Sequence, residues 1–71
     1  MNGEEKTLEE KILNLLLTRG LMSTSQIARE LNVRREIVAG YLRALKDQGK
    51  IEIHKVGNAY VYSLKLQKVS R

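Results

Sequence analysis

The side chains best suited to chemistry in this sequence are cationic, and they gather in its second half. The 71 residues include 13 Lys and Arg and eight Asp and Glu, for a formal net charge of +5. Residues 34–71 hold nine basic and three acidic side chains, whereas residues 1–33 hold four basic and five acidic ones. Such a distribution favours a polyanionic partner, although many small basic domains bind no nucleic acid, so charge alone leaves both readings open.

Other reactive side-chain types are scarce. The chain has no cysteine, and His54 is its single histidine, so neither a disulfide framework nor a thiolate zinc site is available. We find no paired nucleophile and base, no phosphate-cradling glycine loop and no metal-ligand cluster. We therefore expect no catalytic residues, metal, cofactor or small-molecule ligand, and predict that the chain is not an enzyme.

The length and composition predict one small globular domain. Hydrophobic residues make up 42% of the chain and charged residues 30%, an ordinary balance for a folded protein. We expect residues 1–71 to form a single domain with an ordered core at about 7–66 and flexible ends at 1–6 and 67–71. A core of this size is marginal, which favours a partner subunit. The polar, acidic start lacks the apolar segment of a signal peptide, so we expect a cytoplasmic location and no membrane association.

The first helix is predicted from local signals at both ends. The segment Thr7–Glu10 has the form of a capping box, so the helix should begin at Leu8, and Gly20 should end it. Leu13 and Leu17 widen its apolar stripe beyond the arc of a one-sided helix. Either the helix is wedged between other elements or these two residues form a dimer interface, and we favour the dimer.

Two more helices follow, joined by a tight turn. A second capping box at Ser23–Gln26 opens a helix through Leu31, and Asn32 suits the left-handed conformation of a turn. The third helix should run from about Arg34 or Arg35 to Gln48. Its expected buried residues are Val38, Tyr41, Leu42 and Leu45. Two helices with this spacing make a helix-turn-helix candidate.

The remaining residues predict a β-hairpin. Residues 50–56 alternate in polarity, Gly57-Asn58 suits a two-residue turn with positive backbone angles, and a return strand should run from Ala59 to about Leu66. This register pairs Val56 with Ala59, Ile53 with Tyr62 and Ile51 with Leu64, which we expect to place the apolar side chains on one face. Tyr60 and Tyr62 should cover the core, and His54 should lie on the outer face.

The order of helix, short strand, helix, turn, helix and hairpin resembles the winged helix-turn-helix family. The segment 23–33 resembles the second helix and turn of that family, and 37–51 resembles its third helix and the passage into the wing. The resemblance spans roughly residues 8–66. It implies an α+β fold of three helices plus a C-terminal two-stranded β-hairpin wing, as in small prokaryotic, archaeal or viral transcription regulators. Winged helices also serve as RNA-binding, protein-binding and dimerisation modules.

Two details depart from relatives of this fold. The family often caps the third helix with serine or threonine, whereas Arg34 stands at that position here, giving a weaker cap and an alternative role as a phosphate contact. A related branch that binds left-handed Z-DNA uses a third-helix tyrosine with proline and tryptophan in the wing. This chain has no proline and no tryptophan, which argues against that branch.

The resemblance implies that the third helix enters the major groove of DNA. Arg35 and Arg43 would donate to guanine, and Glu36 would accept from cytosine. The same face should also include Arg34, Ala39, Gly40 and Lys46. The alternative is a solvated face with ion pairs such as Arg43 with Asp47. Gly40 either lets the helix sit deep against DNA or makes room for a neighbouring helix.

Contacts outside the third helix would position the protein without reading bases. Lys50, Lys55 and Asn58 should follow the phosphate backbone or enter the minor groove. Ser23, Ser25 and Gln26 stand at the positive end of the second helix and would bind another phosphate, although helix capping also explains them.

We therefore predict a sequence-specific protein that binds double-stranded DNA as a homodimer and regulates transcription at the nucleoid. A winged-helix protein-interaction module inside a larger assembly is the alternative.

Overall fold

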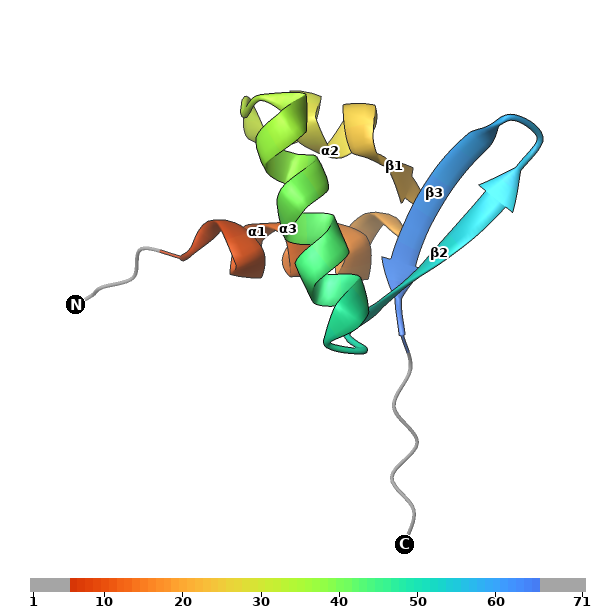
Figure 1. Cartoon of the computed structure of the whole chain (residues 1–71). Helices are drawn as coiled ribbons and strands as arrows, with labels where there is room; N and C mark the ends of the chain where they lie inside the picture. The colour runs from red at the N-terminus through yellow and green to blue at the C-terminus, as the bar shows by residue number, and fades with distance from the viewer. Residues whose placement is uncertain (1–5, 66–71) are drawn as a thin grey trace, which may run out of the picture.

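The computed structural model describes residues 6–65, which form three helices and one three-stranded sheet. The elements, in chain order, are α1 (Leu8–Arg19), β1 (Met22–Ser23), α2 (Thr24–Leu31), α3 (Arg35–Asp47), β2 (Ile51–Val56) and β3 (Ala59–Leu64). The antiparallel sheet has the strand order β1-β3-β2, and the β2–β3 hairpin projects from the helices as a wing (Figure 1). This confirms the winged helix-turn-helix fold. The ends expected to be flexible, and the end of the return strand at Leu66, lie outside the described residues.

Both predicted capping boxes are present. The Thr7 hydroxyl accepts from the Glu10 amide at 3.1 Å, and the Glu10 carboxylate accepts from the Thr7 amide at 3.1 Å. The Ser23 and Gln26 pair repeats this exchange at 3.2 and 2.9 Å at the start of α2. Each box satisfies amides that the first turn of a helix leaves without an intrahelical partner.

The predicted turns are present too, with one difference in the wing. Gly20 ends α1 at a φ of 91°, and Asn32 ends α2 in the left-handed conformation at a φ of 57°. In the wing only Gly57 takes a positive φ, at 63°, whereas Asn58 does not, contrary to the expectation of two positive angles. A positive angle at the first central position alone is the pattern of a type II′ turn, whose twist suits a hairpin equally well.

A single apolar core joins all three helices to the sheet. Its buried residues are Ile12, Leu16, Met22, Ile27, Ala28, Val38, Leu42, Leu45 and Ile51. Tyr41, which we expected in this core, is 39% exposed. At about 100° per residue, Tyr41 lies at the margin of the arc defined by Val38, Leu42 and Leu45, and the core closes without it.

The sheet has the predicted register, but its apolar side chains do not all lie on one face. The pairs Ile51–Leu64, Ile53–Tyr62 and Val56–Ala59 are all present. Because side chains alternate along a strand, Val56 and Ala59 lie on the face opposite Ile51 and Ile53, so the expectation of a single apolar face is wrong for that pair. Tyr62 packs against the core as predicted.

Two further features of the sheet concern Tyr60 and the short strand after α1. Tyr60, expected to cover the core, is 52% exposed, because the hairpin has extended beyond the helices at that point. The short strand expected after α1 is present as β1, and it pairs with β3, Met22 with Tyr62 and Ser23 with Val61. β3 is consequently the central strand.

The Ser23 cap provides a test of what holds α2 in place. We expect Ser23→Ala to lower the free energy of unfolding by about 1 kcal/mol, because it removes the hydroxyl that accepts from the Gln26 amide. The matched control is Ser25→Ala in the same turn, whose exposed side chain makes no cap bond in the described structure and should change stability by less than about 0.5 kcal/mol. Urea denaturation measures both, and equal effects would contradict the assignment.

Candidate nucleic-acid interface

The outward face of α3 is an open surface that combines cations with small residues. Arg35, Glu36, Ala39, Gly40 and Arg43 are all exposed. Arg34 directly before the helix and Lys46 near its end are exposed as well. The buried arc of α3 holds only apolar side chains, so the core fixes the rotation of the helix and turns every charged residue outward.

Within the described residues, the cations of this face have no acidic partner. The ion pairs of residues 6–65 are Arg19–Glu30, Lys50–Glu9 and the weaker His54–Glu52, and none involves α3. The alternative in which Arg43 is occupied by Asp47 is therefore not what the structure contains. Several such cations along one helix create a positive field with donors free to bind anionic oxygens.

Gly40 lies on this face with nothing packed against it. A Cβ placed at Gly40 would have no heavy atom within 4 Å, apart from the chain neighbours and the backbone of its own helix. No neighbouring helix of the described structure needs the space, so the packing explanation for this glycine is wrong. Its backbone angles do not require glycine either, since Gly40 is absent from the positive-φ positions.

The start of α2 borders the start of α3. Thr24, Arg35, Glu36 and Ala39 line a shallow hollow between the two helices. Sequence reasoning missed Thr24, although its place next to the predicted cap was a usable signal. Ser23 and Gln26 use their side chains in the capping box, which leaves Ser25 as the exposed hydroxyl of that turn.

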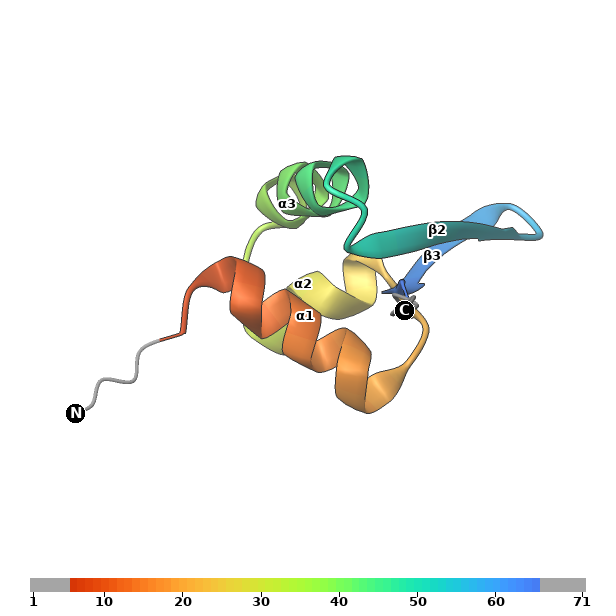
Figure 2. The same ribbon diagram turned by 90° about the horizontal axis from the view of Figure 1, so that it is seen from below.

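The wing carries one lysine near its tip and one at its base, and the two differ in whether they have an anionic partner. Lys55 and Asn58 are exposed near the tip, and the Lys55 ammonium lies 5.8 Å from the centre of the Tyr60 ring. Lys50, at the base, donates to Glu9 of α1 at 3.0 Å and thus already has an anionic partner. Seen from below, α3 lies to one side of α1 and α2 while the wing extends past all three helices (Figure 2).

His54 lies on the hairpin as a half-buried residue. Its Nε2 is 2.9 Å from the Ser63 hydroxyl on the neighbouring strand and 3.8 Å from a Glu52 carboxylate oxygen. The contact with Ser63 joins β2 to β3 on the face opposite Ile51 and Ile53, whereas the contact with Glu52 stays within β2.

The two residues predicted for a dimer interface differ in exposure. Leu17 is 69% exposed, whereas Leu13 is half-buried and packs partly against the core. Both line a shallow groove between α1 and the end of β3, together with Lys6, Glu10, Asn14 and Leu64.

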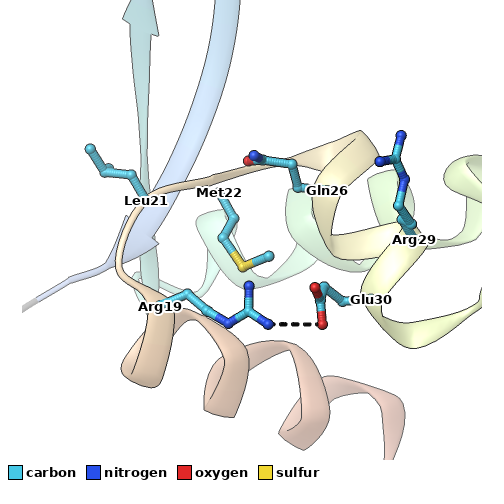
Figure 3. Close-up of a pocket in the computed structure, with 6 residues that line it drawn as sticks. All are labelled: Arg19, Leu21, Met22, Gln26, Arg29 and Glu30. Carbon is cyan, nitrogen blue, oxygen red and sulfur yellow. Dashed lines mark ion pairs between the residues drawn. The ribbon is translucent and has the colours of Figure 1, made fainter.

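Another hollow lies between the end of α1, β1 and the start of α2 (Figure 3). Arg19 and Glu30 pair across it at 3.1 Å, while Arg29 and Leu21 point away from the pair. The ion pair between Arg19 and Glu30 connects α1 to α2 across this hollow. Residues 6–65 hold no group of three or more potential metal ligands, and none of their helices is long and apolar enough to cross a membrane.

Comparison with solved structures shows the winged-helix fold in DNA-binding proteins. The Zalpha domain of Carassius auratus PKZ, in a complex with Z-DNA, is 23% identical over 80% of this chain and 90% of that chain, with a TM-score of 0.74. A point mutant of Lactococcus lactis ZitR in complex with DNA is 24% identical over 90% of this chain, with a TM-score of 0.76. Another structure of ZitR, a zinc-responsive MarR family member, matches at a TM-score of 0.77 and 24% identity, over 92% of this chain.

These likenesses concern the fold, because all three identities are low. The chain spans about half the length of ZitR, covering 45% and 46% of the two ZitR chains. No curated protein matches the sequence.

A family model gives the more specific result. The model for the sugar-specific transcriptional regulator TrmB matches residues 6–66, which include every helix and strand described above. This chain is therefore a winged helix-turn-helix domain that belongs to the TrmB family of transcriptional regulators.

Proposed function

We propose that this domain binds double-stranded DNA sequence-specifically, with α3 in the major groove and the wing on the backbone or in the minor groove. The observation that carries the proposal is the open face of α3, where Arg34, Arg35, Arg43 and Lys46 have no ion-pair partner in the described residues. DNA phosphates would supply the missing negative charge. Membership of a regulator family and the fold shared with DNA-bound PKZ and ZitR support the same function.

The residues of α3 have distinct roles in this proposal. Arg35 and Arg43 donate paired hydrogen bonds to guanine, and Glu36 accepts from cytosine. Ala39 and Gly40 have little or no side chain, so the helix backbone can approach the base edges closely. Arg34 and Lys46, at the two ends of the helix, contact phosphates.

The remaining contacts hold the domain in register on the duplex. Lys55 and Asn58 follow the backbone from the wing, and Ser25 with the free amides of α2 binds a phosphate on the other side. Lys50, Ser23 and Gln26 take part more weakly, because their side chains already have partners within the protein.

We further propose that two copies associate through α1 at Leu13 and Leu17 and read a palindromic site, with half-sites about one helical turn apart. The exposure of Leu17 supports this interface. Such a regulator would act in the cytoplasm, on the nucleoid.

The first experiment measures DNA binding by fluorescence anisotropy with a random-sequence duplex across a salt series. We expect a log-log slope corresponding to several phosphates, at about −0.9 for each phosphate neutralised. The absence of binding even at low salt would overturn the proposal and favour the protein-interaction module instead.

Two substitutions separate base reading from phosphate contact. We expect Arg43→Ala to weaken binding to an operator selected from a random pool by about tenfold or more, with a smaller effect on random DNA. Lys55→Ala should weaken both to a similar extent and reduce the salt slope by about one phosphate. Lys11→Ala, an exposed cation of α1, serves as the control and should alter neither. Equal operator affinity of wild type and both interface variants would contradict the docking.

Gly40 gives a test in which stability and binding change in opposite directions. A methyl group at this position meets open space, so Gly40→Ala should raise the free energy of unfolding by up to about 1 kcal/mol. The same methyl would hold the helix away from the bases and lower operator affinity. Denaturation and anisotropy measure the two effects, and unchanged affinity would show that DNA does not approach this point.

The dimer is tested by sedimentation of Leu17→Glu. We expect wild type to sediment as a dimer and the variant as a monomer, because a charge replaces the most exposed apolar side chain of α1. Leu21→Glu, another exposed leucine, is the control and should remain dimeric. A monomeric wild-type protein would contradict this part of the proposal.

A further inference from the structure

One flank of α3 carries an apolar stripe that neither the core nor the proposed hydrogen bonds use. Ile37 is 45% exposed and Tyr41 39% exposed, and both belong to an open hollow. The hollow is lined by Glu36, Ile37, Gly40, Tyr41 and Ala44. Ile37 and Tyr41 form a small apolar patch that another molecule can cover.

The stripe and the cations lie on opposite flanks of the outward face of α3. At about 100° per residue, Ile37, Tyr41 and Ala44 share one flank of α3, whereas Arg35, Ala39 and Arg43 share the other. Glu36 and Gly40 lie between the two flanks, and Glu36 lines the hollows on both sides. A groove that receives the outward face of α3, with Glu36 and Gly40 at its centre, therefore meets both flanks.

The stripe alone is far smaller than a stable protein interface, so within the proposed docking we look for its partner on the DNA. Stable protein interfaces bury roughly 1,200–2,000 Å² in total, which a few side chains on one helix flank do not approach. The partner that fits is a small apolar group attached to the polyanion that the cations of the opposite flank bind. In the major groove that description applies to the C5-methyl group of thymine.

We propose that Ile37 and Tyr41 read thymine by enclosing its C5-methyl group over Gly40. This inference rests on the proposed function, because it requires α3 to lie in the major groove. Gly40 provides the space, since a Cβ at that position would meet no packed neighbour within 4 Å. The operator then contains A·T pairs adjoining the G·C pairs contacted by Arg35 and Arg43.

The test removes the methyl group from DNA without altering base pairing. An operator is selected from a random pool, and each thymine is replaced in turn by deoxyuridine. Burying one methyl is worth about a threefold to fivefold change in affinity, so at least one replacement should weaken binding of the wild-type protein by about that factor. This measurement uses the natural protein and needs no variant to fold.

Variants then assign the methyl contact to the stripe. Ile37→Ala and Tyr41→Ala, made separately, should each bind thymine and uracil operators with nearly equal affinity. Alanine suits the helix better than isoleucine or tyrosine, and neither side chain belongs to the buried core, so both variants should fold. Leu21→Ala removes an exposed leucine far from α3 in sequence and should retain the full preference for thymine.

The modes of failure are distinguishable. Absence of binding to any duplex defeats the proposed function and, with it, this inference. Selective binding that no uracil replacement weakens overturns the thymine contact alone. A preference for thymine that survives in both stripe variants also overturns it, because the methyl is then bound elsewhere. A stripe variant that changes the sedimenting mass while the thymine preference persists makes the stripe a contact between copies.

Discussion

The burial of Val38, Leu42 and Leu45 is the interaction on which the rest of the structure depends. These three side chains of α3 are at most 1% exposed and join the cluster formed by α1, α2 and the sheet. Because they occupy one narrow arc, the helix has a single rotation at which its apolar groups leave water. That rotation decides which residues face outward. The core therefore determines where the cations, Gly40 and the apolar stripe of α3 lie, although none of them belongs to it.

Local rules explain why so much of the fold could be predicted from the sequence. Each capping box, the left-handed Asn32 and the hairpin register depend on residues within a few positions of one another. The errors occurred where the outcome depends on distant packing. Tyr41 is apolar and lies at the edge of the buried arc, and only the final closure of the core decides its exposure. The short strand β1 was expected, but its pairing with β3 was not predicted, because Met22 and its partner Tyr62 lie far apart along the chain.

The candidate site shows the same contrast between features set by nearby residues and features set by distant packing. Charge patterning and the helical period were enough to predict which residues share the outer face of α3. The sequence did not reveal that Lys50 is paired with Glu9, since 41 positions separate them, nor that Arg43 is free of Asp47. It also left the purpose of Gly40 undecided, because the space around a residue is a property of the assembled domain. Sequence therefore predicted which residues share the exposed face of α3, and the structure shows which charged side chains of the domain have an ion-pair partner.

The strand order also bears on how the domain is made. β3 is the central strand of the sheet and the last described element along the chain, and it holds β1 and β2 together. During synthesis the three helices leave the ribosome before the strand that completes their packing. Until β3 emerges, Met22 and Ile51 lack the sheet that buries them, and apolar surface remains open to aggregation. This domain therefore completes its fold only after β3 has left the ribosome, because that strand joins the elements made before it.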